Sequence, residues 1–160
     1  MDDIIRRNPA GGPIGPGVFK AWGFSQSVSW MGMTHYAGIA PLSGDNPEEI
    51  VCIGAGSMRE QITHVLETLD FCLAADGLDR RRLLSWTIYV TSAKTFFDAS
   101  AILVGWVGDS MPAATLIEVS GLAHPDQMIE ITAVAANASS AMRGCRQRRN
   151  DECLRSSSKD

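Results

Sequence analysis

The sequence predicts an α+β domain in which two helices pack on one face of a β-sheet. Apolar residues alternate with a period of two around Gly32 and again near the C-terminus, while residues 58–75 repeat with a helical period of 3.6. The patterns succeed one another as a hairpin, a helix, a strand, a second helix and two further strands. At 160 residues, the chain has the length of one domain.

The chain begins with a segment that has no periodic pattern. Residues 1–16 are rich in Gly and Pro, so we expect a flexible N-terminal arm. Val18–Trp22 is a first candidate strand, at the start of a domain that we place at residues 17–138. Ser27–Met31 and Met33–Ala37, separated by one glycine, have the composition of a β-hairpin.

The middle of the chain holds the strongest helical signal. Residues 41–57 are rich in Gly and Pro and predict a loop. Residues 58–75 follow as an amphipathic helix with its apolar positions at Ile62, Val65, Leu66, Leu69, Cys72 and Leu73. Ser57 is a predicted N-cap, with Glu60 three positions on completing a capping box. Gly77 is a predicted C-terminal stop.

The second half of the domain alternates strands with one more helix. Leu83–Thr91 is rich in β-branched and aromatic residues and predicts a strand. Residues 93–107 predict a second helix. Thr115–Val119 and Met128–Thr132 predict two strands, and the loop between them has turn-forming residues.

Each of the last two strands contains one carboxylate, Glu118 or Glu130, among apolar neighbours. A carboxylate is costly to bury without a partner. These two residues are therefore edge or solvent-facing residues, or members of a functional site.

Composition restricts the class of function. A net charge of −4 gives no basic surface for nucleic acid. No apolar run approaches the roughly 20 residues that span a bilayer, and no secretory signal is visible, so we expect a cytoplasmic protein. Three scattered His and four Cys without a CxxC pair predict neither a metal site nor a cofactor of that kind. Residues 139–160 hold six Lys and Arg against three acids and predict a basic, disordered tail or a contact with an acidic partner.

The C-terminal strands carry a resemblance to a known family. Residues 112–119 read Pro-Ala-x-Thr-x-x-Glu-Val and residues 129–133 read Ile-Glu-Ile-x-Ala. This pair resembles the signature of the YjgF/RidA family of enamine and imine deaminases, in which an Arg follows Pro-Ala. Residues 23–28 resemble the family's Gly-Pro-Tyr-Ser-Gln-Ala-Val. With further matches at Tyr36–Gly38, Gln61 and Leu84–Thr91, the resemblance covers residues 14–136.

The resemblance implies a chorismate-mutase-like fold and a homotrimer with active sites in the clefts between subunits. Hydrolysis of a C=N bond needs a positioned water and a group that moves its proton, and it needs neither a metal nor a cofactor. The family's water-directing Glu falls on Glu130, which is the predicted catalytic residue. The predicted substrate-binding residues are Phe24, Ser25, Trp86, Ser100, Ala114, Leu116 and Glu118.

Several of these positions depart from the family pattern, and Ala114 matters most because the family's Arg falls there. Without the guanidinium there is no bidentate clamp for a carboxylate. Either the substrate is a larger, less acidic imine or enamine, or another Arg such as Arg6 or Arg7 reaches the site. The alternative is a non-catalytic trimer that binds a small molecule or acts as a chaperone. The ribonuclease description also attached to this family is disfavoured by the acidic charge.

Overall fold

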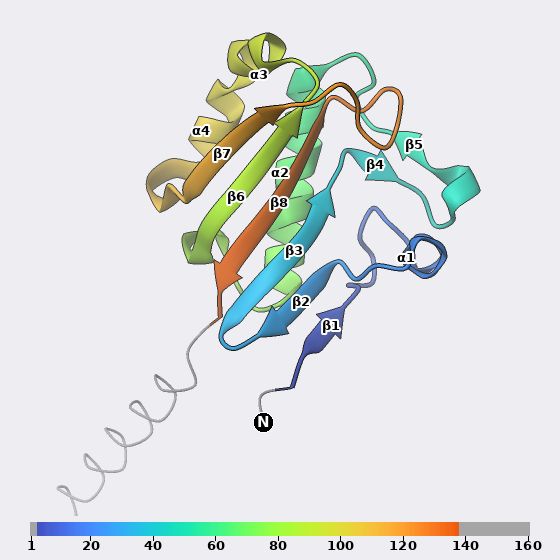
Figure 1. Cartoon of the computed structure of the whole chain (residues 1–160), viewed down its shortest axis with the longest axis vertical. Helices are drawn as coiled ribbons and strands as arrows, with labels where there is room; N and C mark the ends of the chain where they lie inside the picture. The colour runs from blue at the N-terminus through green and yellow to red at the C-terminus, as the bar shows by residue number, and fades with distance from the viewer. Residues whose placement is uncertain (1–2, 138–160) are drawn as a thin grey trace, which may run out of the picture.

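The computed structural model describes residues 3–137, which form a mixed sheet of six strands with helices on one face (Figure 1). The sheet order is β1-β2-β3-β8-β6-β7, and only β6 and β7 are parallel. The strands are β1 (Ile5–Arg7), β2 (Ser27–Trp30), β3 (Met33–Ile39), β6 (Leu83–Val90), β7 (Ala113–Glu118) and β8 (Ile129–Ala136). The predicted α+β class, with helices on one face, is confirmed.

Helix α2 (Met58–Ala75) begins and ends where the sequence predicts. The Ser57 hydroxyl accepts a hydrogen bond from the Glu60 backbone N–H at 3.3 Å, which supplies the N-cap half of the predicted capping box. Gly77 has φ +70°, a left-handed conformation that Gly adopts without cost. The Leu78 N–H then donates to the Leu73 carbonyl at 2.9 Å and closes the helix end.

The core lies between the sheet and the helix layer, which also contains α3 (Ala93–Ala99) and α4 (Ala101–Val107). Side chains alternate along β8: Ile129, Ile131, Ala133 and Ala135 are buried toward the helices, while the residues between them are half-buried on the other side. We call that other side the open face, because no described helix covers it (Figure 1).

The open face carries large apolar side chains. Trp30 and Met33 are register partners on β2 and β3, and they are 50% and 38% exposed. Ile117 on the β7 edge is 39% exposed. Apolar patches of this kind mark protein interaction surfaces more often than scattered single residues do.

Strand β1 is a feature that the sequence did not predict, because it lies inside the expected N-terminal arm. Ile5–Arg7 pairs antiparallel with β2. The Arg7 guanidinium also donates to the Asp76 carboxylate at 2.6 Å, at the C-terminal end of α2. Backbone pairing and an ion pair therefore attach this segment to the sheet and to the helix layer.

The predicted strand at residues 18–22 is wrong: these residues belong to helix α1 (Pro16–Trp22). Pro16 has the φ angle that the first helical turn needs, and Gly23 ends the helix in a left-handed conformation. Gly17 lies so close to the loop that follows β4 that a Cβ there would be 2.6 Å from the Asp45 carbonyl oxygen. The local helix signals at Pro16 and Gly23 flank a short apolar run that also fits a strand, and the packing of Gly17 against this loop adds to them.

Two further segments refine the predictions. The predicted helix at residues 93–107 divides at Ser100 into α3 and α4. The predicted loop at residues 41–57 contains a small two-stranded sheet. The short elements are β4 (Leu42–Ser43), β5 (Val51–Cys52) and 3-10 turns at Pro47–Glu49, Arg80–Arg82 and Gly108–Ser110. The predicted tail at residues 139–160 lies outside the described residues, and the domain boundary at 138 stays a prediction.

Candidate functional site

Glu130 lies on β8 with its side chain on the open face, half-buried between β3 and the loop that precedes β8. Its Oε2 accepts a hydrogen bond from the Gln127 side-chain amide at 2.9 Å. The carboxylate rests against Gly38 at the bulge of β3, where a Cβ would lie 2.7 Å from the Glu130 Cδ. The carboxylate is therefore placed by an amide on one side and by a bare backbone on the other.

Gln127 is a residue that the sequence analysis missed. It is 2% exposed and closes a turn in which its backbone N–H donates to the His124 carbonyl at 3.0 Å. Its side-chain oxygen accepts from the His124 N–H at 3.3 Å, and its amide nitrogen also donates to the Ile129 carbonyl at 3.2 Å. A polar residue immediately before a strand of buried residues was the only available signal.

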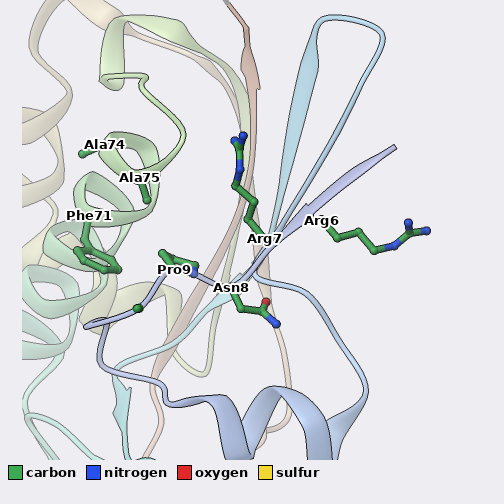
Figure 2. A pocket seen from close by; sticks show the side chains of 8 residues that line it. Arg6, Arg7, Asn8, Pro9, Phe71, Ala74 and Ala75 are labelled. Atoms are coloured by element: carbon green, nitrogen blue, oxygen red, sulfur yellow. The ribbon is translucent and has the colours of Figure 1, made fainter. Parts of the chain in front are cut away.

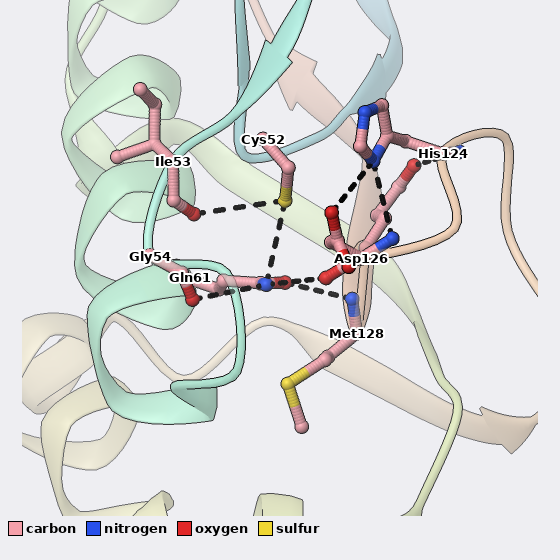
Figure 3. A network of polar contacts seen from close by, with 8 residues as sticks. Cys52, Ile53, Gly54, Gln61, His124, Asp126 and Met128 are labelled. Atoms are coloured by element: carbon pink, nitrogen blue, oxygen red, sulfur yellow. Dashed lines mark hydrogen bonds and ion pairs between the residues drawn. The ribbon is translucent and has the colours of Figure 1, made fainter.

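A second buried glutamine fixes the same loop from the other side (Figure 3). Gln61, in the first turn of α2, is fully buried. Its amide nitrogen donates to the Asp126 carbonyl at 2.8 Å, and its oxygen accepts from the Met128 N–H at 2.7 Å. Nearby, burial and then the Asp126 carboxylate raise the pKa of the Cys52 thiol, so this cysteine stays protonated and is a poor nucleophile.

Phe24 and Ser25 lie in the segment that runs beside the Glu130 end of β3. The carbonyl of the next residue, Gln26, accepts from the Ala37 N–H at 2.9 Å, one residue before Gly38. The Phe24 ring meets Phe19 of α1 edge-on, with centroids 5.1 Å apart. Backbone pairing therefore brings these two predicted residues to the neighbourhood of Glu130.

The predicted residues of β7 face the other way. β6 and β7 pair in parallel as Trp86↔Ala114, Ile88↔Leu116 and Val90↔Glu118. Glu130 pairs with Tyr89, which points to the face opposite Ile88. Within one chain, Ala114 and Leu116 therefore lie on the helix side of the sheet edge and Glu130 lies on the open face.

Three of the remaining candidates have structural partners. The Trp86 ring is 4% exposed and stacks on Trp106 with centroids 6.0 Å apart, so it belongs to the core of this chain and not to a surface near Glu130. The Glu118 carboxylate accepts from the Ala93 N–H at 2.7 Å and satisfies the N-terminus of α3. The Ser100 hydroxyl donates to the Phe97 carbonyl at 2.8 Å between α3 and α4.

A hollow of about 570 Å³ lies elsewhere, between the N-terminal segment and the end of α2 (Figure 2). It is lined by Arg6, Arg7, Asn8, Pro9, Ala10, Phe71, Ala74 and Ala75. Arg7 is engaged by Asp76, and Arg6 points away from the helix. Over residues 3–137, no helix is long and apolar enough to cross a membrane, and no three His, Cys, Asp or Glu side chains gather where they could hold a metal ion.

Comparison with known proteins identifies the fold and the family. The family model described as endoribonuclease L-PSP matches residues 19–137. A RutC family protein of Pyrococcus horikoshii is 29% identical over 135 residues, which are 84% of this chain and 98% of that protein. A crystal structure of a Rid family protein from Yersinia pestis has a TM-score of 0.69 at 22% identity, covering 84% of this chain and 99% of that one. A YjgF family protein from Neisseria meningitidis has a TM-score of 0.66 at 22% identity, covering 86% and 98%.

The family model spans strands β2 to β8, the helix layer and the loop that carries Gln127 and Glu130. The fold comparisons agree with the chorismate-mutase-like architecture that the resemblance implied. The chain therefore belongs to the endoribonuclease L-PSP family, the family of the YjgF/RidA proteins.

Proposed function

We propose that the chain forms a cytoplasmic homotrimer that acts on an imine, an enamine or a related electrophilic intermediate in a pocket between subunits. Enamine and imine deaminases predominate in its family. The substrate is a specialised intermediate of a biosynthetic or catabolic pathway that lacks the carboxylate of a 2-imino acid. Glu130 is the catalytic residue, and neither a metal nor a cofactor takes part.

The observation that carries this proposal is the placement of Glu130. Its carboxylate lies on the open face beside a glycine, with one oxygen held by Gln127. A carboxylate in such a place can orient a water toward an electrophilic carbon and accept its proton. Phe24 and Ser25 lie in the adjoining segment, where they would line a substrate.

The chemistry needs only these groups and water. The water oxygen bonds to the imine carbon while a proton passes to the Glu130 carboxylate. The same proton then moves to the nitrogen of the tetrahedral adduct. The Glu130 carboxylate next takes the hydroxyl proton of the adduct and passes it to the nitrogen as the C–N bond breaks, so that ammonia and a carbonyl compound are released. With an enamine substrate, Glu130 would first take a proton from the enamine nitrogen and deliver it to the β-carbon, which generates the imine.

The division of the predicted residues supports a pocket between subunits. Glu130 lies on one side of the sheet, whereas Ala114 and Leu116 lie on the other side at the β7 edge. A second copy of the chain would bring a β7 edge to an open face. The exposed Trp30 and Met33 side chains of that face also favour its burial in an oligomer.

Ala114 supports the choice of a less acidic substrate. It is exposed on β7, and the position carries a methyl group where the family resemblance places a guanidinium. A small apolar side chain leaves space and makes no ion pair with a substrate carboxylate. The same observation favours the second candidate function, a non-catalytic trimer that binds a small molecule or acts as a chaperone.

The test is ammonia release from freshly generated 2-iminopropionate and from a panel of larger, uncharged imines. We expect wild type to accelerate hydrolysis of an uncharged imine, Glu130→Ala to abolish the acceleration, and Ala114→Arg to increase activity on 2-iminopropionate. If wild type hydrolyses no imine or enamine faster than buffer, and Ala114→Arg is also inert, the non-catalytic function replaces the enzymatic one.

A further inference from the structure

Gln127 is a buried polar residue whose role the proposed mechanism does not yet include. We propose that Gln127 is a positioning residue, which holds one oxygen of the Glu130 carboxylate so that the other oxygen faces the substrate. This inference rests on the proposed function of Glu130. It assigns a second residue of this chain to the same site.

The side-chain bonds of Gln127 fall into two groups: some hold the turn, and one reaches Glu130. Its oxygen accepts from His124, and its amide nitrogen donates to the Ile129 carbonyl at 3.2 Å and to the Glu130 Oε2 at 2.9 Å. The bond to Glu130 is the shorter of the two. At 2% exposure, the amide has no room to exchange this partner for bulk water.

The bond to Glu130 has two chemical effects. An N–H that donates to one carboxylate oxygen leaves the other oxygen as the free acceptor for a proton from water. It also fixes the torsion of a side chain that otherwise rotates freely. With Oε2 held, Oε1 lies over Gly38, where the missing side chain leaves room for it.

The loop is also held by bonds that do not involve the Gln127 side chain. The backbone N–H of residue 127 closes the turn on the His124 carbonyl, and this bond is independent of the side chain. Gln61 binds Asp126 and Met128 on the other side of the loop. Replacing the side chain should therefore change Glu130 more than it changes the fold.

The experiment compares two variants of the full chain with a matched control. Gln127→Met keeps the volume and removes both polar atoms, while Gln127→Glu keeps an oxygen for His124 and removes the donor to Glu130. Gln26→Met is the control, because Gln26 is also buried, at 6% exposure, and its amide nitrogen has no partner among the described residues. Circular dichroism checks the fold of each variant.

Two readouts are measured for each protein. The first is the rate of imine hydrolysis with kcat and KM separated. The second is the 13C chemical shift of the Glu130 carboxyl group at the same pH, assigned with Glu130→Gln, which needs no turnover.

We expect both Gln127 variants to lose about tenfold to a hundredfold in kcat with little change in KM, since a displaced general base costs about this much. The 13C chemical shift of the Glu130 carboxyl group should change in both Gln127 variants, and Gln26→Met should change neither kcat nor this chemical shift. If both Gln127 variants keep the wild-type signal and rate while Glu130→Ala is inactive, the positioning role is refuted and the proposed function stands. If wild type has no activity, the proposed function fails, and the carboxyl signal alone then decides whether Gln127 holds Glu130.

Discussion

Gly38→Ala is the sharpest single perturbation of the candidate site. An added Cβ would lie 2.7 Å from the Glu130 Cδ, whereas carbon atoms in contact are about 3.5–4.0 Å apart. The carboxyl group must therefore move by about 1 Å, and a displacement of that size costs about 10²-fold in rate. Gly38 does not have a positive φ, so the substitution adds no backbone strain.

The fold should survive this change, because the group that must move is the end of a flexible side chain. We expect a loss of unfolding free energy within about 1 kcal/mol, measured by urea denaturation at fixed protein concentration. Activity is measured as imine hydrolysis beside Glu130→Ala. Gly105→Ala is the control: this exposed helical glycine has nothing within 4 Å of an added Cβ, so we expect full activity and a gain of about 0.5–1 kcal/mol. The reasoning is refuted if Gly38→Ala keeps more than a third of the wild-type rate while Glu130→Ala is inactive.

Three further predictions concern stability and assembly. Arg7→Met leaves the Asp76 carboxylate, 3% exposed, without its ion-pair partner, so it should lower the free energy of unfolding by about 2–3 kcal/mol in a thermal melt. Arg6→Met should lower it by less than about 0.5 kcal/mol. Equal losses would contradict the role of the ion pair. Burial and then Asp76 raise the pKa of the Cys72 thiol from 9.0 to about 12. Between about pH 9 and 12 the thiol ionises in the unfolded chain but not in the folded one, so the free energy of unfolding should fall as pH rises. Cys72→Ala should flatten this slope by up to about 1.4 kcal/mol per pH unit. Trp30→Glu charges the open face and should convert the proposed trimer into monomers in analytical ultracentrifugation; an unchanged mass would place any subunit interface elsewhere.

The sequence predicts α2 and the hairpin well, because their signals are local. The helix has a continuous 3.6-residue period and a cap at each end. The turn of the hairpin needs left-handed residues, and Met31 and Gly32 adopt positive φ there. Nothing farther along the chain is needed to predict either element.

The N-terminal elements could not be predicted because their stabilising contacts are long-range. β1 has three exposed residues and no apolar pattern of its own. Its attachment depends on Arg7 and Asp76, which are 69 positions apart. α1 depends on close packing between Gly17 and Asp45, which a reading of neighbouring residues does not show.

The candidate site was predictable for Glu130 and not for its surroundings. The family resemblance marks the carboxylate, and the strand alternation places it opposite its apolar neighbours. The roles of Gln127 and Gly38 depend on a turn and a bulge that bring them to the same carboxylate. A glycine within a strand has several structural causes, and a glutamine before a strand has no specific one, so neither residue points to Glu130 until the strands are paired.

Because of the register of the sheet, a pocket that contains both Glu130 and the β7 residues needs two chains. Ala114 is the partner of Trp86 on β6, and Glu130 is the partner of Tyr89. Since side chains alternate along β6, these pairs lie on opposite faces in every monomer with this register. A site that uses both Glu130 and the β7 residues must therefore take them from different subunits.

Mixing two inactive chains tests this argument directly. Glu130→Ala removes the catalytic carboxylate, and Leu116→Arg blocks the β7 side of the proposed pocket, so each homotrimer should be inactive. In a mixed trimer, one intersubunit site combines an intact Glu130 from one chain with an intact Leu116 from its neighbour. Random mixing of equal amounts should therefore restore about a quarter of the wild-type rate. If the site lay within one chain, each copy would carry one damaged residue, and co-expression would restore no activity at any ratio.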